Sequence, residues 1–339
     1  MNFRKLLIGK KTESLLLDQL QHTMTFDQAG GSMHDYLYGV YEQAYVEGQD
    51  SNFLATGRTG FGKSNFGAII QGGSQPILRE ITGRNQRFNF GTDAFWSGFD
   101  FLYGMRPIVL AVTKKLTGLK EDEIIESVGK KTFFSDVLDT LTPEMIESKY
   151  STLKKLEKKY GYRSKWLDEA QDLNSADSMT LFNKELVKIM SGVREMHQLN
   201  TICVPNPWLL NNYVREERVN TVFMIFPMRD RKTTRSKRVV AVYDLSRYFR
   251  LLMADSRYVR RLMISPLRLI DKFKPAAISN NVPMFPEESK EWKVYKIMKM
   301  IATSRLPLQS IKKLEDRQAK PKKKKKDEYK LAMEQLGYV

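Results

Sequence analysis

The stretch that decides the fold reads Gly57-Arg58-Thr59-Gly60-Phe61-Gly62-Lys63-Ser64. It matches the pattern G-x-x-x-x-G-K-[ST] at every position. The glycines let the backbone curl around a phosphate group and aim successive N–H groups at its oxygens. The lysine places a point charge on the β- and γ-phosphates of a nucleotide, and the serine hydroxyl is a ligand for Mg²⁺. The sequence therefore predicts a site for ATP and Mg²⁺, formed by this segment and the following Asn65.

The flanking residues predict a strand, a loop and a helix in the order that phosphate binding needs. An apolar run at 53–56 indicates a short strand before the loop. After the loop, Phe66, Ile69 and Ile70 predict a helix that runs to the glycines at 72 and 73. The N-terminus of that helix would add its dipole to the attraction for phosphate. An earlier helix is predicted from Met33 to Tyr45, with Ser32 as its cap.

A phosphate-binding loop needs an acid after a second strand, which holds the water shell of the magnesium ion. Asp168 is the candidate for this acid, since Trp166 and Leu167 lead into it. Glu169 beside it is the candidate general base, which orients and deprotonates the attacking water. The alternative is that the two acids only cap a helix. The long segment between Ser64 and Asp168 predicts a helical insertion at about 115–160.

Alternating strands and helices predict an α/β fold with a largely parallel sheet. A RecA-like P-loop NTPase core is the form of this fold that the family resemblance described below implies. Three more strand-like runs follow Asp168, at 201–204, 221–228 and 239–245. The last two are joined by a basic loop, and an antiparallel hairpin is the alternative there. We predict four regions: an N-terminal helical segment at 1–49, the ATPase core at 50–246, a helical C-terminal region at 247–315, and a basic linker with a short terminal helix at 316–339.

The composition favours an intracellular protein with a polyanionic partner. The chain has 339 residues and a formal net charge of +17. Such a charge favours nucleic acid or an anionic surface. The one cysteine, Cys203, excludes a disulfide framework within the chain. No apolar run approaches the length of a membrane span, so we expect no span and a cytoplasmic location.

The basic residues concentrate after the second nucleotide motif. Between Arg215 and Leu262 there are 13 Lys or Arg and five acids. The loop 229–238 alone has six basic residues and one acid, and such a loop can grip the DNA backbone without reading sequence. A solvated hairpin tip is the equally weighted alternative. The predicted nucleic-acid contacts are Arg231, Lys232, Arg235, Lys237 and Arg238.

The order of motifs from residue 50 to 228 resembles the HerA–FtsK superfamily of DNA-pumping ATPases. The resemblance rests on Leu167-Asp168-Glu169-Ala170, a long predicted helix, then Val193-Arg194-Glu195, and the strand that leads into Pro205-Asn206-Pro207. In that superfamily an arginine–glutamate pair follows the acid-bearing strand and its helix. The next strand ends in a polar sensor close to a proline. The resemblance thus implies catalytic roles for Arg194 and, as the sensor, Asn206.

The resemblance also implies partners. Members form hexameric rings in which an arginine of one subunit reaches the γ-phosphate held by the next; Arg194 is the first candidate, with Arg215 and Arg218 as alternatives. The implied function is an ATP-hydrolysing DNA translocase of viral genome packaging or mobile-element DNA transfer. Its partners would include a portal, capsid or transfer-channel protein, in the host-cell cytoplasm or on the virion during assembly. The alternatives are a non-motor ATPase switch like the zonular-occludens-toxin-like phage assembly proteins, and a replicative helicase.

Overall fold

The computed structural model divides into two compact units, Met1–Trp292 and Lys293–Val339. It describes residues 7–27, 30–58, 60–95, 110–111, 113–127, 142, 145, 148–152, 155–156, 163–168, 197–229, 236–253, 256–262, 266–297 and 299–300. The first unit contains the central sheet and the predicted nucleotide motifs. Of the second unit, only 293–297 and 299–300 are described.

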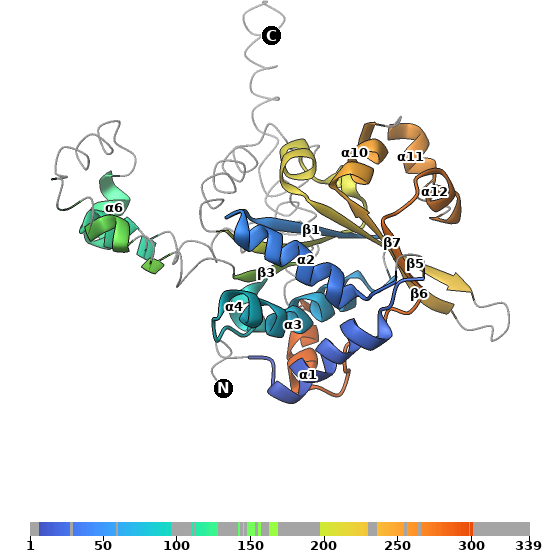
Figure 1. Cartoon of the computed structure of the whole chain (residues 1–339), viewed down its shortest axis with the longest axis horizontal. Helices are drawn as coiled ribbons and strands as arrows, with labels where there is room; N and C mark the ends of the chain where they lie inside the picture. The colour runs from blue at the N-terminus through green and yellow to red at the C-terminus, as the bar shows by residue number, and fades with distance from the viewer. Residues whose placement is uncertain are drawn as a thin grey trace, which may run out of the picture. The chain divides into compact units, whose positions relative to one another are not determined.

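The fold is mixed α/β, with a seven-stranded sheet in the order β2-β3-β4-β1-β5-β6-β7 (Figure 1). From β2 to β5 along this order the neighbours pair in parallel, whereas β6 pairs antiparallel with both β5 and β7. The strands are β1 (Ser51–Thr56), β2 (Ala94–Phe95), β3 (Ser164–Leu167), β4 (Leu199–Val204), β5 (Thr221–Arg229), β6 (Ser236–Asp244) and β7 (Ala277–Ser279). The prediction of an α/β fold with a largely parallel sheet is confirmed.

Helices cover both faces of the sheet (Figure 1). One face carries α1 (Lys10–Asp18), η2 (Gln19–Thr23), α2 (Met33–Val46), α3 (Lys63–Thr82) and α4 (Phe90–Asp93). The other carries η6 (Pro207–Leu209), η7 (Tyr213–Arg218), α10 (Leu245–Met253), α11 (Ser256–Leu262) and α12 (Pro266–Lys272). Within the predicted insertion, the described residues are helical at 113–117, at α6 (Glu121–Ser127) and at 148–152. These layers suit a parallel sheet, which must bury both of its faces.

The helix predicted after Ser32 is α2, and its cap is the predicted one. The Ser32 hydroxyl accepts a hydrogen bond from the Asp35 backbone N–H, and the Asp35 carboxylate accepts one from the Ser32 backbone N–H. This reciprocal capping box satisfies two N–H groups that a helix start otherwise leaves unpaired. The helix therefore begins at Met33 because local chemistry fixes its first turn.

The helix after the phosphate loop is longer than the sequence predicts. The prediction that it ends at Gly72 and Gly73 is wrong, because α3 continues from Lys63 to Thr82. A Cβ atom on Gly72 would lie 2.5 Å from Cδ1 of Leu16, and one on Gly73 would lie 2.6 Å from Cδ1 of Leu20. These glycines therefore let α1 and η2 pack closely on α3 and do not end the helix.

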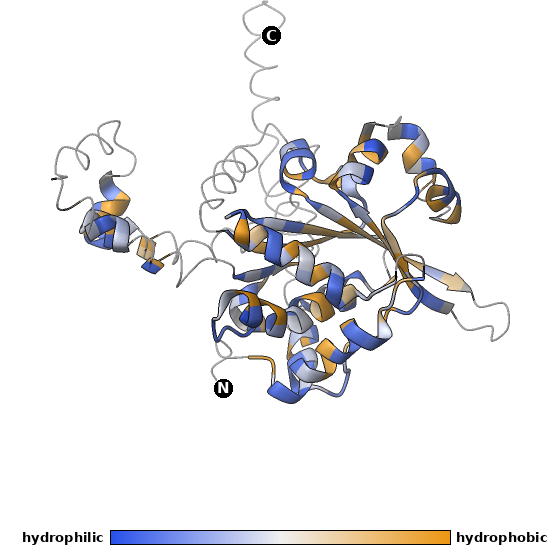
Figure 2. Ribbon diagram, viewed as in Figure 1, coloured by the Kyte–Doolittle hydropathy of each residue, from blue (hydrophilic) through white to orange (hydrophobic). Residues whose placement is uncertain are grey.

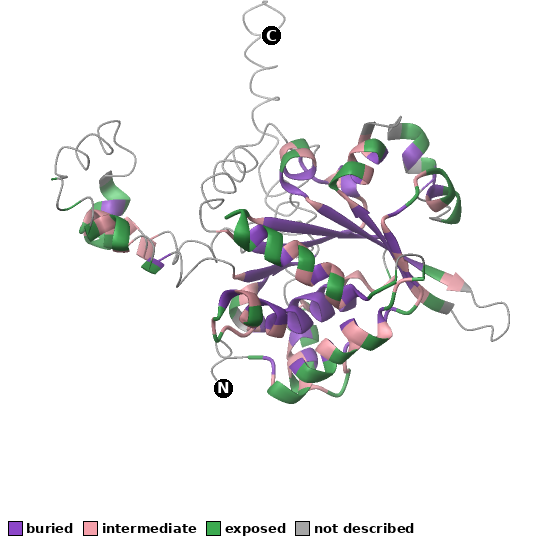
Figure 3. Ribbon diagram, viewed as in Figure 1, coloured by how far each residue is buried: buried purple, intermediate pink, exposed green. Residues whose placement is uncertain are grey.

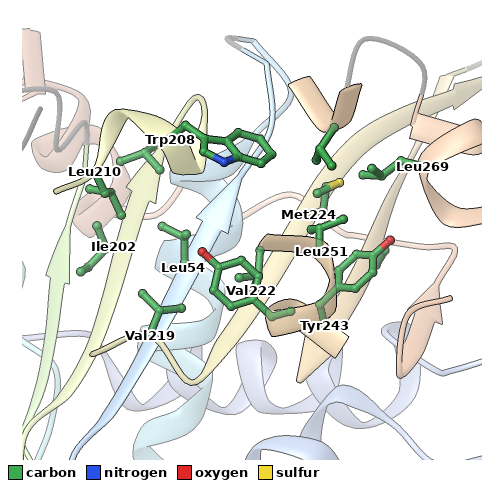
Figure 4. Close-up of a cluster of buried hydrophobic side chains, with 14 of the residues drawn as sticks. Leu54, Ile202, Trp208, Leu210, Val219, Val222, Met224, Tyr243, Leu251 and Leu269 are labelled. Carbon is green, nitrogen blue, oxygen red and sulfur yellow. The ribbon is translucent and has the colours of Figure 1, made fainter. Parts of the chain in front are cut away.

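Apolar side chains fill the space on both sides of the sheet. The helices turn hydrophobic, buried sides toward the strands and hydrophilic, exposed sides outward (Figures 2 and 3). On the α3 face, the Phe223 ring centroid lies 5.4 Å from that of Phe53 and 5.1 Å from that of Phe66. The opposite face carries one buried cluster (Figure 4), which includes Leu54, Ile202, Trp208, Leu210, Val219, Val222, Met224, Tyr243, Leu251 and Leu269. Burying each such side chain contributes about 1.5–3 kcal/mol, which holds the sheet rigid beneath the loops at its edges.

The antiparallel alternative for the last two predicted strands is the observed one. β5 and β6 pair from Thr221 with Asp244 to Arg229 with Ser236. β1 ends at Thr56, level with Met224, so β5 continues past the end of β1 by the residues up to Arg229. The short β7, which the sequence does not predict, pairs with β6 and extends the sheet.

Candidate nucleotide-binding site

The carboxyl ends of three parallel strands meet at one edge of the sheet. Thr56 of β1 pairs with Val204 of β4, and Leu167 of β3 pairs with Ile202 of β4. The strand order reverses at β1, since β4 lies on one side of it and β5 on the other. Ligands of open parallel sheets bind outside the carboxyl ends at such a reversal. The segment 57–64 follows β1 directly, so it lies where the fold favours a ligand.

Two glycines of this segment lie where a side chain does not fit. Gly57 has a φ of 148°, and a Cβ atom there would lie 2.2 Å from the carbonyl oxygen of Ile225. Gly62 precedes α3 with a φ of 86°, and a Cβ atom there would lie 2.6 Å from Nη1 of Arg238. Left-handed backbone of this kind costs glycine little and other residues much more. The path of the loop therefore depends on the glycines that the motif demands.

Lys63 opens α3, and its ammonium group turns back onto the loop. Nζ donates hydrogen bonds to the carbonyl oxygens of Gly57, at 2.7 Å, and Arg58, at 3.1 Å. The unpaired N–H groups and the dipole at a helix N-terminus also attract anions. Both sources of positive charge thus lie at the loop that the sequence assigns to phosphate.

The loop and the predicted acid come together. The Ser64 hydroxyl donates a hydrogen bond to Oδ1 of Asp168 at 3.0 Å, although the two residues lie 104 positions apart. Asp168 is only 1% exposed, and its backbone N–H is held by the carbonyl of Phe95 at 2.8 Å. Mg²⁺ is held in proteins through one or two carboxylates together with substrate phosphates. The residues present therefore fit the magnesium half of a Mg²⁺–nucleotide complex.

Asn206 follows β4 at the same edge, between the ends of β1 and β3. Its Oδ1 accepts a hydrogen bond from the backbone N–H of Trp208 at 3.0 Å and so caps η6. The carbonyl of the preceding Pro205 accepts a hydrogen bond from the Thr56 hydroxyl at 3.4 Å, which ties this turn to the end of β1. Because the cap engages the oxygen, the Nδ2 group remains to donate toward a phosphate or a water. This geometry suits a polar sensor, and its role is still a prediction.

The residue after the motif, Asn65, anchors a distant segment. Its Oδ1 accepts a hydrogen bond from the backbone N–H of Phe285 at 2.8 Å, and its side chain is buried. The Val282 backbone N–H donates to the carbonyl of Arg238 at 3.1 Å. The segment 281–286 therefore packs against the start of α3. Sequence reasoning missed this contact because it joins residues 220 positions apart and no local pattern marks it.

Some predicted site residues lie outside the described part of the chain. They are Thr59 of the loop, the candidate base Glu169, and the candidate trans-acting Arg194. Their roles remain predictions. Of the predicted DNA contacts, Arg231, Lys232 and Arg235 also lie outside it, Lys237 is exposed, and Arg238 is half-buried beside Gly62.

The two alternative arginines lie at the opposite edge of the sheet. Arg215 and Arg218 belong to η7, which precedes β5, and each is only 8% exposed. Arg218 forms an ion pair with Asp50, the residue before β1, and Arg215 forms one with Glu216. A buried, paired arginine cannot reach a neighbouring subunit without breaking its ion pair. This placement counts against Arg215 and Arg218 as the trans-acting residue that the resemblance implies.

A polar cavity of about 520 Å³ lies away from the phosphate loop. Its lining includes Arg163 and Ser164, which stand at the amino end of β3, whereas Asp168 follows the carboxyl end. It therefore has no part in the site built from Gly57 to Ser64, and we assign it no ligand.

No protein-family model matches this chain, and no curated protein matches it. No helix in the described part of the chain is both long and apolar enough to cross a membrane.

Proposed function

We propose that the protein is a P-loop ATPase that binds Mg²⁺–ATP between the loop Gly57–Ser64 and Asp168. The observation that carries the proposal is the 3.0 Å hydrogen bond between Ser64 Oγ and Asp168 Oδ1. In a chance glycine-rich turn, contact with a buried carboxylate that follows a strand two positions away in the sheet would be unexpected. In a magnesium site this contact is expected, because the serine hydroxyl and the carboxylate must both lie next to the metal ion.

Each residue has a role in the proposed reaction. The backbone N–H groups of the loop and the Lys63 ammonium bind the phosphate chain. Ser64 and Asp168 would hold the metal ion, which would stabilise the negative charge of the phosphate groups. Glu169 follows Asp168 directly, and we assign it the proton of the attacking water. Asn206 follows β4 at the same edge of the sheet, and we assign it the orientation of that water or of the γ-phosphate through Nδ2.

The strand order supports the finer proposal of a RecA-like core of the HerA–FtsK type. β4 lies between the strand that leads into the phosphate loop and the strand that leads into Asp168. The candidate sensor therefore stands beside both, as a residue that reports on hydrolysis must. On this basis we propose a DNA translocase acting in viral genome packaging or mobile-element DNA transfer, working as a ring in which Arg194 completes the neighbouring site.

The proposed function predicts that DNA accelerates ATP hydrolysis. The purified chain should release phosphate faster with double- or single-stranded DNA than without it, and should displace a third strand from a triplex only when ATP is hydrolysed. Phosphate release and triplex displacement measured in parallel test this. A rate of ATP hydrolysis that does not change with any length of single- or double-stranded DNA would instead favour the non-motor switch.

A second prediction concerns the basic loop that joins β5 and β6. Neutralising Arg231, Lys232, Arg235 and Lys237 should weaken DNA binding for all sequences, because phosphate contacts do not depend on the bases. Each phosphate contact that is lost should also reduce the steepness of the salt dependence by about 0.9 for B-DNA. A filter-binding titration across salt concentrations measures this slope. Neutralising Lys10 and Lys11, two exposed lysines of α1, is the control, compared per charge removed. An equal fall in slope per charge for the control would mean that overall charge matters and the hairpin does not.

A further inference from the structure

Arg238 lies beside the phosphate loop because the β5–β6 hairpin extends past the end of β1. The carbonyl of Ile225 in β5 faces Gly57, the first residue of the loop. Two residues further along β5, Pro227 pairs with Arg238 of β6. Arg238 therefore stands just beyond the sheet edge at which the loop begins, within the paired part of the hairpin.

The side chain of Arg238 turns toward α3. Strand residues alternate between the two faces of a sheet, and Val239, Ala241 and Tyr243 belong to the cluster on the opposite face. Arg238 accordingly lies on the α3 face. A Cβ atom on Gly62 would lie 2.6 Å from its Nη1, 3.2 Å from its Cδ and 3.3 Å from its Cζ. The guanidinium thus occupies the space directly beside the last glycine of the loop.

Segment 281–286 holds Arg238 in this position. The Val282 backbone N–H donates to the Arg238 carbonyl, and Arg238 Nη2 donates to the sulfur of Met284. The hydrogen bond from Phe285 to Asn65 fixes the same segment to the start of α3. The segment is thus attached both to β6 and to the start of α3, and its Met284 sulfur contacts the guanidinium.

Among the described residues, one nitrogen of this guanidinium has no acceptor. Nη1 of Arg238 is buried and makes no hydrogen bond to any described residue. Burial lowers the pKa of Arg238, and the charge of Glu287 opposes this shift. Arginine nonetheless keeps its charge in proteins, so a half-buried cation with an unused donor lies against Gly62. An anion with several acceptor oxygens is the partner that such a group lacks.

The geometry points to Arg238 as a phosphate-binding residue, which contacts the phosphate chain of the nucleotide held by the loop of its own chain. The inference rests on the proposed nucleotide site and adds a residue to it. The guanidinium would add a permanent positive charge and the Nη1 donor to the charge of the Lys63 ammonium. Arg238 is thereby removed from the DNA contacts predicted for the hairpin.

The test is the affinity of the Arg238→Gln variant for a fluorescent ATP analogue and for inorganic tripolyphosphate. Losing a charge-assisted hydrogen bond should weaken both by about 10- to 100-fold, and Arg238→Lys should recover part of the loss. DNA binding without nucleotide should not change. Lys237→Gln is the matched control, because this exposed neighbour carries the same charge; it should weaken DNA binding and leave nucleotide affinity intact.

The possible failures are distinguishable. If the unaltered chain does not bind the analogue, the proposed nucleotide site itself fails. If Lys63→Ala loses binding while a folded Arg238→Gln variant keeps full affinity, only the role of Arg238 is overturned. Tighter nucleotide binding by Arg238→Gln would show that the guanidinium blocks the site. A lower affinity for the ATP analogue with an unchanged affinity for tripolyphosphate would show that Arg238 contacts the nucleoside. Either result overturns the inference. Thermal unfolding of each variant identifies a chain that has not folded.

Discussion

Lys63→Ala should reduce the affinity for ATP by roughly 30-fold to several thousand-fold, because removing one partner of a close charge pair costs about 2–5 kcal/mol. The ammonium group lies within hydrogen-bond distance of two carbonyls of the loop, so it is already positioned where the phosphates would bind. Hydrolysis should fall with binding. Equilibrium titration of a fluorescent ATP analogue, with phosphate release at saturating ATP, measures both effects.

The control for this variant is Lys11→Ala, which removes the same charge from an exposed position on α1. It should bind nucleotide like the unaltered chain. Lys63→Ala should also unfold at nearly the same temperature, since its side chain is not part of the buried core. Full ATP affinity and turnover in a folded Lys63→Ala chain would remove the basis for both the proposed ATPase and the role of Arg238.

Local chemistry explains which parts of this fold could be predicted. The capping box at Ser32 and Asp35 lies within one turn of helix, and the phosphate loop lies within eight residues. The partnership of Ser64 with Asp168 spans 104 positions, but chemistry demands it, because a phosphate loop without an acid cannot hold magnesium. Such predictions rest on the chemical function of the residues themselves and do not require knowledge of their tertiary contacts.

Packing between distant segments explains the misses. Gly72 and Gly73 suggest the end of a helix, because glycine usually weakens helices. In the structure they lie inside α3, where the absence of a side chain lets α1 pack closely against it. β7 has only three residues in a proline-bearing segment, and its pairing with β6 stabilises it. In the sequence, Arg238 ends the basic run 229–238, and the pattern therefore predicts that it binds DNA with the rest of that loop. Strand alternation gives a different indication, because Arg238 lies on the same face of β6 as the buried Val240 and Val242.

Glu169→Gln should leave ATP binding almost unchanged and reduce hydrolysis by about 100- to 10,000-fold, which is the usual contribution of a general base. The substitution keeps the shape of the side chain and removes only its ability to take a proton. Asp168, one residue earlier, hydrogen-bonds to Ser64 and is buried, and it is the residue that we propose for the metal. Single-turnover hydrolysis, measured beside equilibrium binding of the ATP analogue, separates the chemical step from affinity.

Asp168→Asn is the comparison variant, because substitution of two adjacent acids with different roles should impair different properties of the protein. This variant should lose the magnesium dependence of nucleotide binding, whereas Glu169→Gln should keep it and accumulate a stable complex with ATP. The two binding curves, taken with and without Mg²⁺, therefore assign each acid independently of the rate. If Glu169→Gln instead loses affinity and unfolds at a lower temperature, Glu169 has a structural role, and the base must be sought among other residues at the carboxyl edge of the sheet. If it hydrolyses ATP at the normal rate, the water is activated without it, and Asn206 becomes the residue whose substitution should next be measured.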